Sequence, residues 1–353
     1  MHASRAPAGT ARVVRYRGRT LPYDRTYHLL TQFHKIRLLV ASERPDILEA
    51  HSPYLGAAAV LACGRSAARA RTCFWHTDHI GTYLTPAISN RLGDDVATRA
   101  ARPLWSMVRR LLAHFDATFV AGSAQAETLR RAGVRDVVHV PFGVDVKAFS
   151  PERRSDARRR ELLAEHEEGP LLVAVGRLAF EKRWDVALDA FEKVRARYPG
   201  AVLAFFGDGP ERHRLAAGAP EGVRFLGFER DRIALAEALA SADVLVHACP
   251  YETFGLGVAE AVACGVPVVV PDSGGAASSA DPTTSERYAS LDAGACAAAI
   301  ERVLERRGSA ARTRALAAAA RVPTAEGHMR AVLSAYEGLL RERSARPPLP
   351  YPA

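Results

Sequence analysis

Short apolar runs alternate with longer amphipathic segments through the first half of this chain. The apolar runs, bounded by charged or turn-forming residues, predict strands at 46–50, 71–75, 116–121 and 137–141. Apolar positions that recur every three or four residues predict helices at 53–70, 98–114 and 124–132. One face of the second helix carries Trp105, Val108, Leu111 and Leu112. Ser123 is expected to cap the third helix. This alternation predicts a parallel sheet covered on both faces.

A second alternating series begins after a predicted linker at 142–151, where Gly143, Asp145 and Pro151 favour turns. Its clearest predicted strands are 171–175 and 243–247, and its clearest predicted helices are 182–198 and 259–264. The chain therefore predicts a second α/β unit behind the first.

The end of the chain is different in character. Residues 293–343 are rich in alanine and predict helices, whereas the prolines of 347–352 exclude a helix and indicate disorder. The polar stretch 275–293 predicts an irregular loop, to which we assign no function.

Composition fits a globular protein of two domains. The chain has 353 residues, of which 48% are hydrophobic and 25% charged. No apolar run approaches the roughly 20 residues that span a bilayer, and the first residues lack the apolar core of a signal peptide. Five scattered cysteines have no metal-binding spacing, so we expect buried free thiols in a reducing compartment, the cytoplasm.

The excess positive charge lies in the first half. Residues 1–150 contain 21 Lys/Arg against 11 Asp/Glu, and the remainder contains 27 against 28. Such asymmetry suggests an anionic partner, and without a recognisable nucleic-acid module we expect a membrane surface or a phospholipid-linked acceptor rather than a nucleic acid. A soluble protein of Ala- and Arg-rich composition is the simpler alternative.

The most informative chemistry lies at 250–260, where Glu252 and Glu260 bracket a glycine-containing turn that opens a helix. A helix start offers unpaired N–H groups to a phosphate, and Gly255 has no side chain to block their approach. The two carboxylates could each bind a sugar hydroxyl. The alternative is an ordinary strand-to-helix turn with two solvated glutamates.

A second phosphate-type feature lies upstream. The predicted strand at 171–175 runs into Gly176 and Arg177, and Lys182 follows at the start of the next helix. Arginine supplies a planar fork of donors and lysine a point charge, which together suit two phosphates. Two surface cations beside a loop are the alternative, but both segments together favour a site for a sugar, a diphosphate and a ribose.

These segments resemble the family-4 retaining glycosyltransferases of the GT-B fold, also described as glycosyl transferases group 1. The matching pieces are 176–182, 206–210, 223–228, 252–260, 263–270 and 273–275. The resemblance covers about residues 45 to 340, in the family's order. It implies two Rossmann-like α/β/α domains that face each other across a cleft.

The resemblance also implies domain boundaries. The acceptor-side domain is expected at 1–145 and the nucleotide-sugar-binding domain at 146–325. A final helix at 326–345 is expected to cross back to the first domain, and a disordered tail is expected at 346–353.

Roles for individual residues follow from the same resemblance. Arg177 and Lys182 would hold the donor diphosphate beside Gly176, with amides near Gly255 and Leu256 on a phosphate. His76 and Glu252 would be the catalytic residues on the donor sugar. Phe254 would lie in the donor site and Glu260 would bind the ribose. Asp78 and His79 would lie near the acceptor. His76 follows a predicted strand, as does His51, for which a structural role is the preferred reading. No metal is expected, because no Asp-x-Asp clamp is present where it would matter.

The expected function is transfer of a hexose from GDP-mannose or a UDP-sugar to a lipid or glycan acceptor, with retention. The nucleotide sugar is a substrate, and no cofactor is expected. The expected location is the cytoplasm, with peripheral association at the inner face of the membrane as a further expectation. The alternatives are a non-catalytic nucleotide-sugar-binding protein and a GT-B nucleotide-sugar epimerase.

One departure from the family concerns the first residues. Family members begin with a buried strand and a glycine-rich loop, whereas residues 13–30 already look like mid-domain sequence. We therefore expect an incomplete first domain that lacks about one strand–helix–strand unit. A protein without that unit should express poorly or aggregate, because the neighbouring strand would expose unpaired backbone groups.

Overall fold

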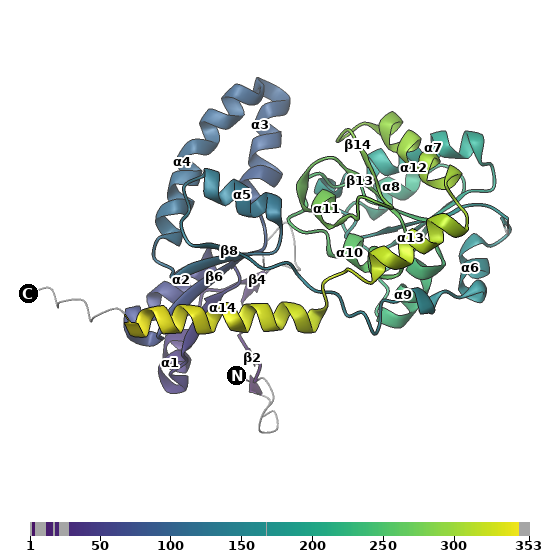
Figure 1. Cartoon of the computed structure of the whole chain (residues 1–353). Coiled ribbons are helices and arrows are strands. Elements are labelled where there is room, and N and C mark those ends of the chain that lie inside the picture. Colours follow the sequence, from purple (N-terminus) through teal and green to yellow (C-terminus); the bar gives the residue numbers. More distant parts are fainter. Residues whose placement is uncertain (1, 4–11, 17, 21–27, 167, 346–353) are drawn as a thin grey trace, which may run out of the picture.

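Two parallel sheets form the frame of the computed structural model, which describes residues 2–3, 12–16, 18–20, 28–166 and 168–345 (Figure 1). The first sheet has the order β5-β6-β7-β8. Its strands are β5 (Ile47–Ala50), β6 (Ala70–Trp75), β7 (Ala117–Val120) and β8 (Val137–His139). Two short antiparallel pairs precede it, β1 (His2–Ala3) with β2 (Val14–Arg15) and β3 (Arg19–Thr20) with β4 (His28–Leu29). All four predicted strands of this half are confirmed.

The helices of the first half depart from prediction in places. They are α1 (Phe33–Glu43), α2 (Leu55–Ala62), a 3-10 turn (Arg65–Ala67), a π-helical turn (Ile80–Leu84), α3 (Thr85–Leu92), α4 (Asp94–Leu112) and α5 (Ser123–Arg131). The predicted helix 53–70 is too long: Gly64 has φ +86°, a left-handed conformation that ends the helical path, and Ala70 already belongs to β6. The face of α4 that carries Val108 and Leu112 is buried, as predicted.

The predicted cap at Ser123 is wrong. Gly122 is the capping residue of α5, and Ser123 is already the first residue of the helix. The Ser123 hydroxyl instead donates to the Ser278 hydroxyl, 3.2 Å away in the second half of the chain. A tertiary contact has therefore replaced a local one.

The second sheet is larger and parallel throughout, with the order β11-β10-β9-β12-β13-β14. Its strands are β9 (Leu171–Val175), β10 (Val202–Phe206), β11 (Val223–Gly227), β12 (Val244–Val246), β13 (Val268–Pro271) and β14 (Glu286–Tyr288). The expectation of an irregular loop at 275–293 is wrong, because β14 lies within it and pairs with β13. Polar β14 is an edge strand, so its sequence lacks the apolar run that marks a central strand.

Helices cover both faces of the second sheet. They are α6 (Asp156–Leu163), α7 (Trp184–Arg197), α8 (Arg212–Ala217), α9 (Arg232–Ser241), α10 (Leu256–Ala263), α11 (Gly274–Ser279), α12 (Ala293–Glu305) and α13 (Ser309–Ala319), with 3-10 turns at Pro151–Arg153 and Phe180–Lys182. Most of their apolar side chains are buried against the strands.

The predicted linker is packed into the structure. Val144 and Phe149 are fully buried, and their cluster joins residues of both sheets. Val144 also pairs as an isolated bridge with Thr324, so the chain crosses between the halves at two adjacent places. Asp145 accepts a hydrogen bond from the Lys147 N–H at a turn, and Pro151 begins a 3-10 turn, as expected. Gly143 makes no turn, and a Cβ there would lie 2.0 Å from the Thr324 carbonyl oxygen.

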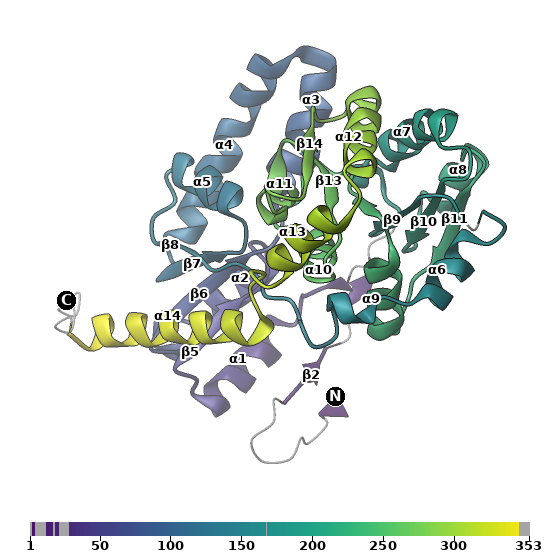
Figure 2. The ribbon, with the colours of Figure 1, turned by 45° about the vertical axis from the view of Figure 1, so that its right-hand side comes forward.

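Helix α14 (Ala325–Ala345) leaves the second half and lies along the first sheet, as both views show (Figures 1 and 2). Tyr336 packs edge-on against Phe119 at 5.5 Å, and Arg343 forms an ion pair with Asp116. This helix fixes the first sheet relative to the second. The tail predicted at 346–353 lies outside the described residues.

Strand β5 is an edge of the first sheet in the described part of the chain. The expectation of an incomplete first domain is not tested by this strand order. None of the described helices combines the length and apolar character needed to cross a bilayer. All five cysteines are free thiols, and four are buried.

Candidate functional site

A cavity of about 280 Å³ lies at the junction of the two halves. The first half contributes His76, Thr77, Thr82 and Tyr83. The second half contributes Arg177, Glu181, Lys182, Cys249, Tyr251, Glu252 and Thr253. Many of these residues follow the carboxyl ends of β6, β9 and β12, where ligands bind in parallel sheets. Among the predicted site residues, the cavity brings together His76, Arg177, Lys182 and Glu252.

Lys182 and Glu252 form an ion pair in this cavity. Lys182 Nζ lies 2.6 Å from Glu252 Oε2, and both side chains are about four-fifths buried, at 20% and 21% exposure. Burial is the largest single influence on the pKa of Lys182 and acts to lower it, but the charge and hydrogen bond of Glu252, with Cys249 and Glu181, together raise that pKa. Burial likewise acts to raise the pKa of Glu252, and Lys182, His247 and Cys249 together lower it. Both groups are therefore charged at neutral pH.

The cationic loop after β9 is held by a buried tryptophan. Trp184 Nε1 donates to the Arg177 carbonyl at 2.9 Å, and the Trp184 side chain is only 1% exposed. Gly176 has φ +155°, and a Cβ there would lie 3.0 Å from Trp184 Cζ2. The Arg177 guanidinium forms an ion pair with Glu181 at 3.0 Å. Sequence reasoning did not predict Glu181 at the site, and because Arg177 lies in a loop, the spacing of four residues between them gave no helical signal.

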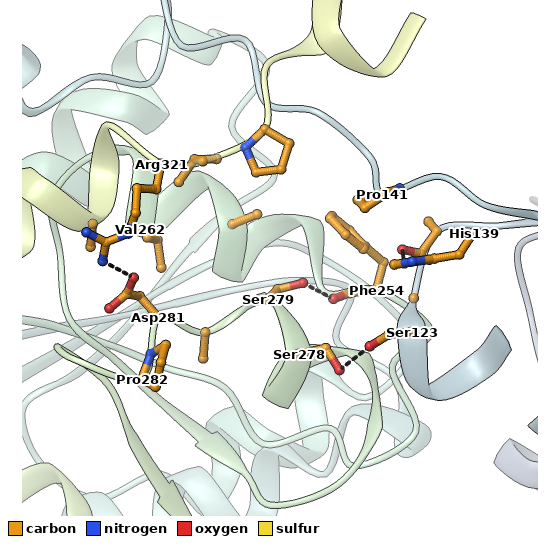
Figure 3. A pocket seen from close by; sticks show the side chains of 17 residues that line it. Ser123, His139, Pro141, Phe254, Val262, Ser278, Ser279, Asp281, Pro282 and Arg321 are labelled. Carbon is orange, nitrogen blue, oxygen red and sulfur yellow. Dashed lines mark hydrogen bonds and ion pairs between the residues drawn. The ribbon is translucent and has the colours of Figure 1, made fainter. Parts of the chain in front are cut away.

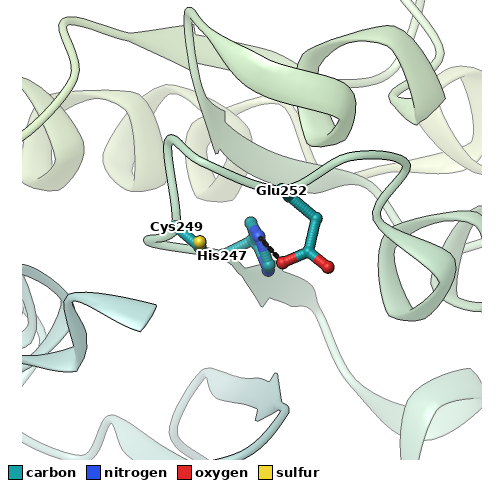
Figure 4. Close-up of side chains that lie close together, drawn as sticks. All are labelled: His247, Cys249 and Glu252. Atoms are coloured by element: carbon teal, nitrogen blue, oxygen red, sulfur yellow. Dashed lines mark ion pairs between the residues drawn. The ribbon is translucent and has the colours of Figure 1, made fainter. Parts of the chain in front are cut away.

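The buried His247 and Cys249 lie close to Glu252, and sequence reasoning assigned a role to neither (Figure 4). His247 Nε2 has no hydrogen-bond partner in the described structure and lies 3.7 Å from Glu252 Oε2. Burial lowers the pKa of His247 to about 4, and it raises the pKa of the Cys249 thiol to about 12. The sequence did contain a signal for His247, because this histidine lies at the end of a predicted buried strand.

His247, Cys249 and Glu252 could converge on a metal ion, because their ligand atoms lie within 4.8 Å of one another. However, the ammonium group of Lys182 already contacts Glu252, and the thiol would have to lose a proton at a pKa of about 12. A divalent cation would have to displace Lys182 against the repulsion of its charge. We therefore infer that Lys182, rather than a metal ion, supplies the positive charge beside Glu252.

The turn into α10 needs its glycine. Gly255 has φ +84°, and a Cβ there would lie 2.9 Å from Ala276 Cα. Gly255 and Leu256 begin the helix but do not line the 280 Å³ cavity, and neither does Gly176. Their predicted contacts with a donor phosphate stay predictions.

Glu260 and Phe254 lie away from this cavity. Glu260 is 5% exposed and forms an ion pair with Arg232 Nη2 at 2.9 Å, while burial raises its pKa. Phe254 packs edge-on against Phe142 at 5.3 Å. For Glu260 to bind a ribose, it would have to share or exchange its arginine partner, and this role also stays a prediction.

Phe254 instead lines a second cavity of about 300 Å³ between the halves (Figure 3). Most of its lining is apolar, and its charged residues Asp281 and Arg321 form an ion pair with each other at 2.6 Å. The Ser123–Ser278 hydrogen bond also spans this cavity. The cavity with Arg177 and Lys182 is therefore the better candidate for a phosphate.

His76 lies across the first cavity from these cations. Its ring stacks on Phe74 at 4.5 Å, and its backbone carbonyl accepts a hydrogen bond from Thr253 Oγ1 at 2.7 Å. That bond ties the first half to the loop that carries Glu252. Asp78 is buried and accepts from the Gly81 N–H at 2.8 Å, so it closes the π-helical turn.

Two family models match this chain. Residues 2–148 match "Glycosyltransferase Family 4", and residues 169–306 match "Glycosyl transferases group 1". A GDP-mannose-dependent alpha-mannosyltransferase of Mycolicibacterium smegmatis is 33% identical over 307 residues, which is 86% of this chain and 76% of that protein. A GDP-mannose-dependent alpha-(1-6)-phosphatidylinositol dimannoside mannosyltransferase of Mycobacterium tuberculosis is 42% identical over 164 residues, covering 46% of this chain and 42% of that protein.

The matched length varies among relatives. Across four of the curated relatives, the match covers only 42–65% of the relative's own length. Among solved structures, Anabaena HepE in complex with UDP and glucose has a TM-score of 0.68 at 18% identity, covering 86% of this chain and 80% of that one. This likeness shows the fold, and the GT-B architecture expected from the sequence is confirmed.

Proposed function

This chain belongs to glycosyltransferase family 4, and from that premise we propose that it transfers a hexose from a nucleotide sugar to a lipid or glycan acceptor, with retention of configuration. One observation carries the proposal. Arg177, Lys182, His76 and Glu252 line a single cavity between the two sheets. The two cations suit a diphosphate, and the carboxylate and the imidazole suit sugar hydroxyls.

The reaction breaks the bond between the anomeric carbon of the sugar and the oxygen of the diphosphate. The diphosphate leaves with the bonding electrons, and Arg177 and Lys182 stabilise the negative charge that develops on it. The acceptor hydroxyl attacks the same face of the anomeric carbon and gives its proton to a leaving phosphate oxygen. Glu252 and His76 orient the sugar, and no metal or protein nucleophile takes part.

We propose GDP-mannose as the first donor to test and a UDP-sugar as the second. Support for GDP-mannose comes from relatives that are named as GDP-mannose-dependent mannosyltransferases. Support for a UDP-sugar is weaker, because it comes from a structural neighbour of 18% identity with bound UDP. The phosphatidylinositol mannoside named for one relative makes such a lipid the first acceptor to test.

The purified chain should release GDP from GDP-mannose and form a mannosylated product only when an acceptor is added. Release should be unchanged by a chelator such as EDTA, because Lys182 supplies the positive charge at Glu252. The measurement is nucleotide release and product mass over a panel of GDP- and UDP-sugars. Donor binding without turnover would favour the non-catalytic alternative, and acceptor-independent conversion to an epimer would favour the epimerase. Loss of activity with EDTA would contradict the metal-free mechanism.

We further propose that the pair α3 and α4 docks on an anionic membrane surface from the cytoplasm. The two helices pack against each other and project away from the first sheet (Figures 1 and 2). Arg99, Arg102 and Arg110 are exposed on α4, as is the apolar Met107 at 54%, and Leu92 at the end of α3 is 65% exposed. Exposed arginines beside apolar side chains suit a surface of anionic lipids. The free thiols suit the reducing cytoplasm.

Replacing Arg99, Arg102 and Arg110 with glutamine should weaken binding to phosphatidylserine vesicles about 100-fold, at about 1 kcal/mol for each basic residue near the surface. Vesicle sedimentation measures this, with pure phosphatidylcholine as the uncharged comparison. The effect should shrink at high salt, since the attraction is screened.

A matched variant removes the same number of charges elsewhere. Arg230, Arg312 and Arg314 are exposed in the second half, and their replacement with glutamine should leave vesicle binding nearly unchanged. Equal losses in both variants would mean that net charge alone, rather than α3 and α4, controls the binding.

A further inference from the structure

Alternate residues of two neighbouring strands place a chain of polar groups on one face of the first sheet. Glu49 lies on β5 and His51 follows two positions later, while His76 follows β6, which is parallel to β5. Glu49 Oε1 lies 3.1 Å from His51 Nε2. His51 Nδ1 lies 2.7 Å from His76 Nε2. A continuous carboxylate–imidazole–imidazole chain therefore leads to the histidine of the candidate cavity.

Glu49, the first group of this hydrogen-bonded series, is held by further contacts. Thr72 Oγ1 donates to Glu49 Oε2 at 2.8 Å, and the Tyr336 hydroxyl of α14 also bonds to Glu49. Burial opposes the ionisation of Glu49, but the hydrogen bonds from His51, Tyr336 and Thr72 together lower its pKa. Glu49 is therefore an anion at neutral pH and can only accept hydrogen bonds.

Ring stacking fixes the two imidazole planes. The rings of His51 and His76 lie edge to edge, with centroids 5.0 Å apart and planes 17° from parallel, as the 2.7 Å contact between their nitrogens requires. His76 stacks on Phe74 at 4.5 Å and on Phe142 at 5.7 Å, within 10° of parallel in both cases. These contacts hold the ring planes, and the bonds from His51 to Glu49 and His76 keep the nitrogens matched.

The position of each proton follows from the order of the bonds. An ionised Glu49 requires a proton on His51 Nε2, and if His51 carries this proton alone, its Nδ1 is an acceptor. His76 must then carry its proton on Nε2 and donate it to His51. Burial and the neighbouring His51 lower the pKa of His76, against an opposite effect of Glu49, so the neutral ring fits this arrangement.

We propose that Glu49 and His51 are positioning residues that hold His76 as its Nε2–H tautomer. Tyr336 of α14 is the outermost member of this hydrogen-bonded series, through its bond to Glu49. The catalytic part of the inference rests on the proposed function. With Nε2 occupied by His51, Nδ1 is the ring nitrogen left for a substrate, and it can only accept. His76 would therefore accept a hydrogen bond from a hydroxyl of the donor sugar or the acceptor, and it would not donate one to the leaving phosphate.

The tautomer can be measured without any activity. In protein with ¹⁵N-labelled histidine, long-range ¹⁵N–¹H correlation spectra distinguish the two neutral tautomers, and loss of one pattern in His76→Gln assigns the resonance. The Nε2–H pattern is expected at neutral pH in the unliganded protein. An Nδ1–H pattern, or a ring protonated on both nitrogens, would overturn the inference and leave the proposed function untouched.

A matched pair of variants separates the hydrogen bond from the stacking. His51→Phe keeps an aromatic ring against Phe74 and His76 but removes the acceptor, whereas an amide oxygen in His51→Gln can still accept from His76 Nε2–H. We expect His51→Phe to lose the single-tautomer pattern and to lower kcat about tenfold at nearly constant KM, the scale of one hydrogen bond. His51→Gln should keep both properties close to those of the natural protein.

Tyr336→Phe removes one donor to Glu49 and should lower kcat less than His51→Phe does. Equal activity and tautomer patterns in His51→Phe and the natural protein would show that only the stacking matters, and this would overturn the proposal. If no variant, nor the natural protein, transfers sugar, the proposed function fails, while the spectra still decide the tautomer.

Discussion

Replacing Lys182 with methionine is expected to lower kcat for sugar transfer by about 10²–10³-fold, the usual effect of removing one preorganised donor from a developing negative charge. Methionine keeps most of the length of the side chain and removes only the charge. In this structure the ammonium lies 2.6 Å from Glu252 and has its raised pKa, so it is positively charged when the donor arrives. The measurement is steady-state release of nucleoside diphosphate with donor and acceptor.

The lysine also neutralises a buried carboxylate, and its loss should have a second effect. Without Lys182, burial should raise the pKa of Glu252, since Lys182 is the main influence that lowers it. The double variant Lys182→Met, Glu252→Gln should then unfold at a higher temperature than Lys182→Met alone, because no unpaired carboxylate remains. A Lys182→Met protein within threefold of the natural kcat would contradict the assignment of the cavity.

Replacing Gly122 with alanine should lower kcat about 100-fold by moving the two halves apart. A Cβ at Gly122 would lie 1.9 Å from the Thr253 carbonyl oxygen, which is backbone and cannot rotate away. The loop from Pro250 to Gly255 would have to shift, and the bond from Thr253 Oγ1 to the His76 carbonyl would break. A displacement of about 1 Å between reacting groups can cost about 10²-fold in rate.

This loss should be specific to catalysis across the junction. Binding of a nucleoside diphosphate by calorimetry should weaken much less, since Arg177 and Lys182 both lie in the second half. Gly338→Ala provides the control, because Gly338 lies within α14 with nothing within 4 Å of its added Cβ. That variant should keep its activity and gain roughly 0.5–1 kcal/mol in stability. Full activity in Gly122→Ala would mean that the junction tolerates movement.

Local patterns were reliable where one segment decides its own structure. The strand at 171–175 is buried on both faces, so its apolar run is unambiguous. The helix predicted to reach Ala70 instead ended near Gly64, since alanine-rich sequence does not mark the point where a chain turns toward its next strand. The cap at Ser123 failed for another reason: its hydroxyl found Ser278, which is distant in sequence.

In the candidate site too, single residues could be predicted from the sequence, but the contacts between them could not. Arg177, Lys182 and Glu252 could be proposed from the residues around them, because each lies where a strand meets a helix. The ion pair between Lys182 and Glu252 could not be proposed from the sequence, and neither could the buried His247 beside Glu252. Glu260 fitted a local pattern as well, yet the fold pairs it with Arg232, away from the cavity that holds Glu252.

The amino-acid sequence by itself determined the alternation of strand and helix, the order of the two α/β units and the kind of charge available to a phosphate. Those properties depend on hydrophobic period and residue type over short stretches of chain. Only the tertiary structure decided which charges meet, that His76 faces the cations, and that His51 and Glu49 stand behind it. These contacts join residues far apart along the chain, and their geometry is set by how two sheets and α14 pack together, which no short stretch of sequence contains.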